Sequence, residues 1–285
     1  MGDPKGTPLD HLNSREDVLR RVQTADSVFL PREVFEALYL NPERNVPGDL
    51  RKKFGNPTPA CLIGFVIAAT PYACANMGWR GAGGAGGAII PTMIFFGGVL
   101  QVLGAIGEWI LGNTFSMCLF FTYGTFWIVA GTQLIPWFGV GVQYSPGGSN
   151  LQGMTEPSYY ATFGFYYLSL ALLTTIFTVC ALRTNIVFFC ALFTLVFSFA
   201  CGAGAFWNLA LGNVHAGERL TVAAGAFTFA LTAMVWYVLA VQLLEAVDFP
   251  ITLPVGDLSR YIKGKKEREQ LVKERMRGGG ATPAE

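Results

Sequence analysis

A carboxylate and an amide lie at helical spacing within a long apolar stretch of the chain. Gln101 and Glu108 share a stripe with Gly97, Gly104 and Gly112, and each member follows the previous one by three or four residues. This spacing places all five on one helix face, where small residues let helices approach closely inside a bilayer. A buried acid there must face protein or water, so Glu108 is a candidate functional residue able to exchange a proton. The alternative is a structural Glu108 near the membrane edge that caps a neighbouring helix.

Asn56 opens a proline-rich segment, Gly55-Asn-Pro-Thr-Pro59, directly before a short apolar run. Proline suits the first turn of a helix, and the freed N–H groups of a helix start attract anions. The Asn56 amide either caps this helix or turns toward a polar path. Pro71 removes a hydrogen bond within the same run and favours a kink. Broken membrane helices commonly line transport sites, and they also occur in purely structural roles.

Tyr123 lies midway along another apolar run, between Thr122 and Gly124. Its ring can narrow a path across a membrane, and its hydroxyl can bond a carboxylate. The alternative is a tyrosine that packs against a neighbouring helix with its hydroxyl on a backbone carbonyl. The residue types alone leave both interpretations open.

The chain offers little for enzymatic, metal or nucleic-acid chemistry. It has two histidines and six cysteines, all six inside apolar runs and none in a CxxC pair. We therefore expect buried or lipid-facing thiols and no metal or other cofactor. No Ser/His/Asp set, HExxH motif or pair of acids occurs in the apolar region, so we do not expect an enzyme. A net charge of +1 provides no electrostatic footprint for nucleic acid.

The charge distribution indicates what must position these residues. Charged residues make up 14% of the chain, against about 25% in an ordinary soluble domain. Residues 54–244 contain only six of them, namely Arg80, Glu108, Glu156, Arg183, Glu218 and Arg219. A soluble core is therefore not expected, and the chain divides into a polar region 1–53, an apolar region 54–244 and a basic tail 245–285.

Six apolar runs lie in the central region, at 60–77, 89–111, 115–138, 159–182, 186–207 and 221–244. A bilayer core needs about 20 helical residues, and the runs lack the alternation of a membrane barrel. The sequence therefore predicts an all-α integral membrane protein with six transmembrane helices. We expect the glycine-rich faces, including Gly97 and Gly104, to join protomers into an oligomer.

An even number of spans puts both termini on one side of the membrane. Subtracting Arg80, Arg183 and Arg219 from the 20 basic residues leaves 17 in the two terminal regions. The positive-inside rule then predicts that both termini are cytoplasmic. The tail cluster would contact anionic lipid or form a solvated charged helix. A capping pattern at 14–17 predicts a short helix through Val22. The first 30 residues contain no apolar run, so we expect no cleaved signal.

Five motifs occur in an order that resembles a known family. They are Asn56-Pro-Thr-Pro59, Phe96-Gly-Gly98 with Gln101, Glu108 with Gly112-Asn-Thr-Phe115, Thr122-Tyr-Gly124 with Phe126-Trp127, and Leu253-Pro-Val-Gly256. Together they resemble the acetate uptake transporter family, the succinate–acetate permeases of bacteria and their fungal relatives. The long N-terminal region and the glycine-rich loop at 81–87 resemble the fungal members. Thr58 and Ala60-Cys61 depart from the usual family motif.

The resemblance implies a hexamer of six-helix protomers, each with its own central path. It also implies a constriction formed by Phe65, Tyr123 and Leu195. On this basis we expect plasma-membrane transport of acetate and similar small monocarboxylates, either proton-coupled or channel-like. Asn56, Gln101, Thr122 and Tyr123 would replace the water around the carboxylate, and Glu108 would exchange a proton.

Two other functions remain open at this stage. Almost no basic residue lies in the apolar runs to hold an anion, so ammonia or ammonium is an alternative permeant. The other alternative is a membrane sensor that transports nothing. Such a sensor would be expected to carry a large folded soluble domain, and neither terminal region resembles one.

Overall fold

The computed structural model describes residues 54–251, 253–256, 258 and 268. The helix expected near 14–22 and most of the basic tail lie outside the described residues. Within them, six helical segments are long and apolar enough to cross a membrane, as the sequence predicts. They are α4 (Thr58–Asn76), the composite segment Gly84–Ile110, α7 (Thr114–Gln133), α9 (Pro157–Ala181), α10 (Ile186–Ala210) and α11 (Val214–Ala246).

The second segment is not the single α-helix predicted at 89–111. It begins as a 3-10 helix, η3 (Gly84–Ile89), continues through α5 (Ile90–Thr92) and the π-helical η4 (Met93–Leu100), and ends as α6 (Gln101–Ile110). π-helical turns inside α-helices occur frequently at functional sites. The predicted stripe survives this change, because Gly97, Gln101, Gly104 and Glu108 are all buried. Gly112 instead ends the helix with a φ of 76°.

Two helix ends differ from the sequence prediction for local reasons. α7 ends at Gln133 rather than 138, because Ile135 precedes Pro136 and adopts an extended conformation. The connection to α9 contains η5 (Pro136–Phe138), η6 (Val142–Tyr144) and the short α8 (Asn150–Gly153). α11 begins seven residues early and has 33 residues, about 50 Å at 1.5 Å per residue. It is therefore longer than the roughly 30 Å hydrocarbon core that it crosses.

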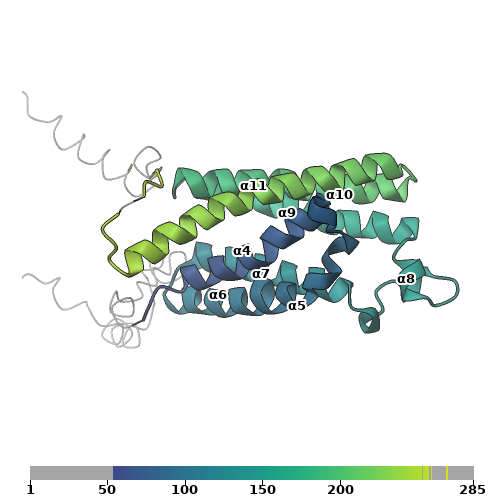
Figure 1. Cartoon of the computed structure of the whole chain (residues 1–285), viewed down its shortest axis with the longest axis horizontal. Coiled ribbons are helices and arrows are strands. Elements are labelled where there is room, and N and C mark those ends of the chain that lie inside the picture. The colour runs from purple at the N-terminus through teal and green to yellow at the C-terminus, as the bar shows by residue number, and fades with distance from the viewer. Residues whose placement is uncertain (1–53, 252, 257, 259–267, 269–285) are drawn as a thin grey trace, which may run out of the picture. The chain divides into compact units, whose positions relative to one another are not determined.

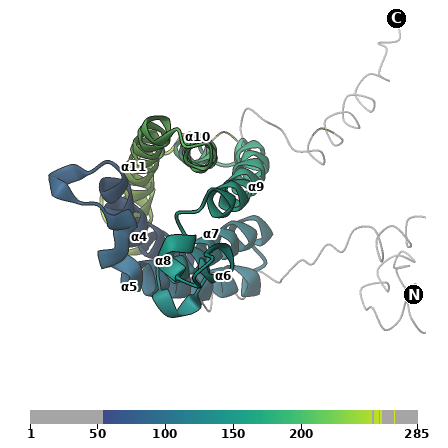
Figure 2. The same cartoon turned by 90° about the vertical axis from the view of Figure 1, so that its right-hand side faces the viewer.

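The helices surround a common axis, as the end-on view in Figure 2 shows. α10 packs between α9 and α11, α11 packs on α4, and α4 packs on the second segment, which in turn packs on α7. Side chains connect α7 to α9, where the Tyr123 and Thr174 hydroxyls are 2.9 Å apart. In Figure 1 the start of α4 and the end of α11 lie at the same end of the bundle. Pro71 does not divide α4, which continues past it as one helix from Thr58 to Asn76.

The glycine stripe packs inside the protomer, which corrects the prediction that it joins protomers. A Cβ at Gly97 would lie 2.5 Å from Cγ of Trp127, and one at Gly202 would lie 2.5 Å from the ring of Tyr167. A Cβ at Gly104 would collide with the Cys61 sulfur. These glycines therefore bring α4, α7, α9 and α10 close to their neighbours within one chain.

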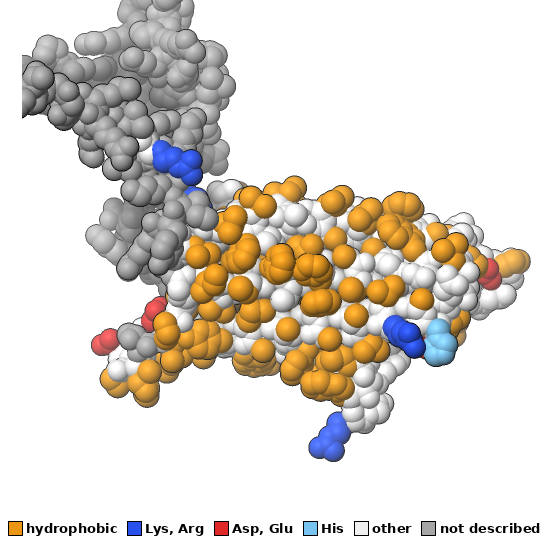
Figure 3. All heavy atoms as spheres, turned by 90° about the horizontal axis from the view of Figure 1, so that it is seen from above, with side chains coloured by type: hydrophobic (Ala, Val, Ile, Leu, Met, Phe, Trp, Pro, Cys, Tyr) orange, Lys and Arg blue, Asp and Glu red, His pale blue; other side chains and the backbone are white. Residues whose placement is uncertain are grey.

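Large apolar side chains cover the outside of the bundle instead. They include Phe95, Leu103 and Trp109 on the second segment and Leu172, Ile176 and Val179 on α9, each more than half exposed. Figure 3 shows this apolar surface along the bundle, with charged side chains sparse on the face seen. Such a surface suits hydrocarbon, because lipid chains require no polar partner.

Candidate functional site

Two internal cavities meet at four side chains. The larger has a volume of about 240 Å³ and the smaller about 30 Å³, and both are lined by Phe65, Tyr123, Leu195 and Leu231. We call these residues the four-residue ring. They come from α4, α7, α10 and α11, respectively. Four different helices must therefore assemble before the ring exists.

α4 shows the order of the cavities along the bundle. Leu62 lines only the small cavity, Phe65 lines both, and Tyr72 and Asn76 line only the large one. The 14 residue steps from Leu62 to Asn76 span about 21 Å of helix. The two cavities thus follow one another along α4, with the four-residue ring between them.

Tyr123 is held tightly in this ring. It is only 3% exposed, and its hydroxyl pairs with that of Thr174 on α9. Its ring lies edge-on to Phe177 at a centroid distance of 6.2 Å and stacks on Phe199 at 6.3 Å. The hydroxyl therefore bonds a side chain rather than the backbone carbonyl that the packing interpretation assumed, while the ring faces both cavities.

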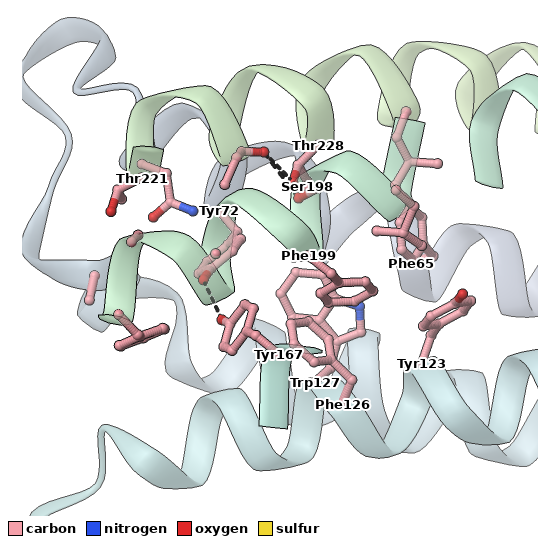
Figure 4. Close-up of a pocket in the computed structure, with 18 of the residues that line it drawn as sticks. Phe65, Tyr72, Tyr123, Phe126, Trp127, Tyr167, Ser198, Phe199, Thr221 and Thr228 are labelled. Atoms are coloured by element: carbon pink, nitrogen blue, oxygen red, sulfur yellow. Dashed lines mark hydrogen bonds between the residues drawn. The ribbon is translucent and has the colours of Figure 1, made fainter. Parts of the chain in front are cut away.

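The large cavity carries most of the polar groups. Figure 4 shows Thr221, Tyr72 and Tyr167 toward one end of it, Ser198 and Thr228 in between, and Phe65 and Tyr123 at the other end. Ser198 and Thr228 pair at 2.7 Å, and the Tyr72 and Tyr167 hydroxyls lie 3.4 Å apart. These neutral groups can each donate or accept a hydrogen bond.

Apart from Tyr123 of the ring, the small cavity has one polar lining residue, Gln101. This side chain is 1% exposed, and its Oε1 atom has no hydrogen-bond partner. A buried carbonyl oxygen without a partner is costly, because it has lost its bonds to water. Gln101 Oε1 is therefore an acceptor that the fold leaves unused beside the small cavity.

A third cavity, of about 330 Å³, lies where α4 begins. It is lined by Phe54, Asn56, Thr58, Leu111 and Asn113. Asn56 Oδ1 accepts a hydrogen bond from the Thr58 backbone N–H at 3.1 Å. Asn56 thus satisfies a free donor of the first turn of α4 and also lines the cavity. Its place on a transport path stays a prediction.

Glu108 and Thr122 line none of these three cavities. Glu108 is fully buried and accepts hydrogen bonds from the Thr58 hydroxyl and, at 2.6 Å, from the Asn113 side-chain amide. It therefore joins the start of α4 to the turn before α7 through two side-chain hydrogen bonds rather than as a backbone cap. The Thr122 hydroxyl donates to the Cys118 carbonyl within α7 at 2.8 Å.

Comparison with known proteins places this architecture in a family. The model described as the GPR1/FUN34/yaaH family matches residues 39–260. The chain belongs to this family. The match confirms the resemblance carried by the five motifs.

Several relatives of this family member are informative. Protein alcS of Aspergillus fumigatus is 44% identical over 82% of this chain and 87% of that relative. Ammonia transport outward protein 2 of Saccharomyces cerevisiae is 31% identical, over 73% of this chain and 68% of that relative. Acetate permease A of Emericella nidulans is 28% identical, over 94% of this chain and 83% of that relative.

The fold also occurs in a solved structure, that of the bacterial acetate channel SatP. Its TM-score is 0.57 at 24% identity, over 71% of this chain and 99% of that chain. Together with the six apolar helices, the family match identifies a multi-pass membrane protein.

Leu231 is a ring member that sequence reasoning missed. It is an apolar residue in an apolar helix, and no motif marks it. Only the packing of α11 beside α4 and α10 brings it to the boundary between the cavities. Trp127 was visible only as part of a motif, and the sequence does not reveal that it lines the large cavity.

Proposed function

We propose that this protein carries acetate and similar small monocarboxylates across the plasma membrane, without catalysing a reaction. The observation that supports this best is the four-residue ring, where apolar side chains separate two cavities. A permeant would pass the cavity at Asn56, the small cavity at Gln101, the four-residue ring and the large cavity. Relatives named as an acetate permease and an acetate channel agree with this choice.

The energetics explain why such a path is needed. A carboxylate moved into hydrocarbon without partners costs tens of kcal/mol by Born estimates. Neutral donors along the path offset part of this cost without trapping the anion. An apolar constriction accommodates the methyl group and can close by losing its water. In this proposal Glu108 positions Thr58 and Asn113 rather than contacting the permeant.

The test is uptake of labelled acetate into liposomes that contain the purified protein. We expect saturable uptake that is absent from empty liposomes. Leu195→Ala, in the four-residue ring, should change the preference between acetate and a longer carboxylate. Leu172→Ala is the matched control, because Leu172 is 61% exposed on the outside of α9. No acetate uptake by the wild-type protein would contradict the proposal.

The same liposomes separate a proton symporter from a channel. Uptake driven uphill by an imposed inward proton gradient indicates coupling to protons. Uptake that only follows the acetate gradient indicates a channel.

Ammonium is the second candidate permeant. Within the described part of the chain, no Lys or Arg lines the three cavities, and one relative is named for ammonia transport. Uptake of labelled methylammonium without uptake of acetate would favour this alternative.

We also propose an arrangement in the membrane and an assembly. Both terminal regions, 1–53 and 245–285, would lie in the cytoplasm, with the basic tail beside anionic lipid, so that the large cavity opens outward. Six copies would associate through their outer apolar faces. The number six comes from the family resemblance. Native mass measurement in mild detergent tests it, and an active monodisperse monomer would contradict it.

A further inference from the structure

The indole of Trp127 carries a hydrogen-bond donor without an acceptor. Trp127 is 2% exposed, and its Nε1 atom is buried with no partner. Two other tryptophans of the bundle use theirs: Trp207 donates to the Ala161 carbonyl at 3.2 Å, and Trp236 donates to the Thr70 hydroxyl at 3.1 Å. A buried indole N–H usually finds an acceptor, so the exception at Trp127 requires an explanation.

The packing around Trp127 fixes the direction of this donor. Its ring lies edge-on to Phe126 at a centroid distance of 5.2 Å, to Tyr72 at 5.5 Å and to Phe65 at 6.3 Å. Gly97 of the π-helical η4 lies directly behind it and leaves no room for a Cβ. The indole is therefore held in one orientation and cannot turn to seek another acceptor.

The donor lies beside the large cavity, near the four-residue ring. Trp127 lines that cavity together with Phe65 and Tyr123. Figure 4 shows the indole nitrogen on the side of the ring system toward Phe65 and Tyr123. An acceptor that has just passed the four-residue ring, or is about to pass it, would meet this N–H first.

We propose that Trp127 Nε1–H is a binding group for the permeant carboxylate, on the large-cavity side of the four-residue ring. On the other side of the ring, the Gln101 atom without a partner is Oε1, which can only accept, so it gives no equivalent carboxylate site. A carboxylate would bond the Trp127 N–H while its methyl group faces the ring. This inference rests on the proposed function.

The chemistry of the indole also makes the site selective. An indole N–H can only donate, so it suits a carboxylate oxygen and offers nothing to ammonium, which has no lone pair. A hydroxyl or amide at this position would accept as well as donate and would serve both permeants. The proposed site therefore favours monocarboxylates over ammonium.

The test removes the N–H while retaining the ring. Trp127 is replaced by 3-benzothienylalanine, which has sulfur in place of the N–H group, and separately by Phe. We expect the KM for acetate to rise by roughly tenfold or more in both, as for loss of one hydrogen bond to a charged group. Trp207→Phe is the matched control, because its indole donates to a backbone carbonyl and does not line the cavity. It should leave the KM for acetate unchanged.

A second readout detects the hydrogen bond directly. Ultraviolet resonance Raman spectra of the wild-type protein, with those of Trp127→Phe subtracted, isolate the indole of Trp127. Adding acetate should shift its N–H band, and adding methylammonium should not.

The outcomes separate this inference from the proposed function. Wild-type acetate uptake with an unchanged KM in the benzothienyl variant would overturn the role of Trp127 and leave the proposed function intact. Absence of wild-type acetate uptake would overturn the proposed function, and the Raman band would then decide whether Trp127 binds a carboxylate. An unshifted band in acetate would overturn the Trp127 site in either case.

Discussion

The two cavities beside the four-residue ring differ in size and in chemistry. The large one, of about 240 Å³, is lined by several hydroxyl-bearing residues, Asn76 and Trp127, whereas the small one, of about 30 Å³, has Gln101 as its polar side chain apart from Tyr123 of the ring. At 10–15 Å³ for each water, the small cavity has room for about two. A permeant thus keeps much of its water on one side of the ring and loses nearly all of it on the other.

This difference indicates where selection takes place. In the large cavity, water and several hydroxyls can solvate many small solutes. In the small cavity, a permeant depends on one amide and on apolar walls, so its own shape and charge decide whether it enters. We therefore expect discrimination at the four-residue ring and the small cavity, and predictions that disturb each side test this asymmetry.

The largest expected effect comes from Gly97→Val, which would disrupt the packing of η4 against α4 and α7 behind Trp127, a residue of the large cavity. A Cβ there would also lie 2.9 Å from the Ala68 Cβ, in addition to its clash with Trp127. Overpacking of this kind costs about 1–3 kcal/mol or more, so the thermal midpoint and folded yield should fall. Gly87→Ala is the control, because nothing lies within 4 Å of its Cβ position. Fluorescence-detected gel filtration after heating measures the thermal midpoint and the folded yield. Equal midpoints for the Gly97→Val and Gly87→Ala variants would contradict this account of the packing.

Tyr123→Ala should have the next largest effect, this time on selectivity, because loss of the aromatic ring would join the two cavities. The ratio of butyrate uptake to acetate uptake should rise by roughly tenfold, the lower end of what one or two methylenes are worth in an apolar pocket. Competition of butyrate with labelled acetate measures it. An unchanged ratio would remove Tyr123 from the selective part of the path.

Tyr123→Phe separates the hydroxyl from the ring. It should keep the size preference and lose about 1 kcal/mol of stability, because Thr174 loses its partner. Adding Thr174→Val should recover part of that loss, and a double-mutant cycle measures the coupling. If the two changes in the free energy of unfolding simply added, this hydrogen bond would contribute nothing to stability.

Glu108→Gln should affect stability more than transport, which reverses the expectation drawn from the sequence. Its carboxylate accepts from both Thr58 and Asn113, and an amide has only one oxygen with which to accept. We expect a loss of about 1–3 kcal/mol, with acetate flux per folded protein close to the wild-type value. A large change in flux or in its pH profile at matched folded amount would return Glu108 to the transport path.

Thr122→Ala should have the smallest effect. The hydroxyl bonds a carbonyl of its own helix and faces none of the three cavities. Stability should change by no more than about 0.5 kcal/mol, and acetate flux should not change. A marked loss of flux would mean that Thr122 contacts the permeant in a conformation other than this one.

Much of the fold could be predicted, because the relevant physics is local or one-dimensional. The apolar runs predict six spans, since their length must match the bilayer. The spacing from Gly97 to Glu108 predicts a buried face, since an amide and an acid cannot face lipid. Asn185 accepts from the Phe188 N–H at 2.8 Å and caps α10, and asparagine is among the residues that helix N-caps favour.

The functional geometry depends on contacts that no local pattern encodes. The partners of Glu108 lie 50 residues before it and 5 after it, and whether the glycines face a neighbouring helix or another protomer depends on how the helices assemble. The sequence alone determines which residues leave the lipid, because burial of polar groups follows from composition and period. Only the tertiary structure decides which of them meet, since Leu231, Phe65, Leu195 and Tyr123 come from four helices. The same packing leaves Gln101 and Trp127 on opposite sides of the ring, each with a polar group that the fold itself does not use.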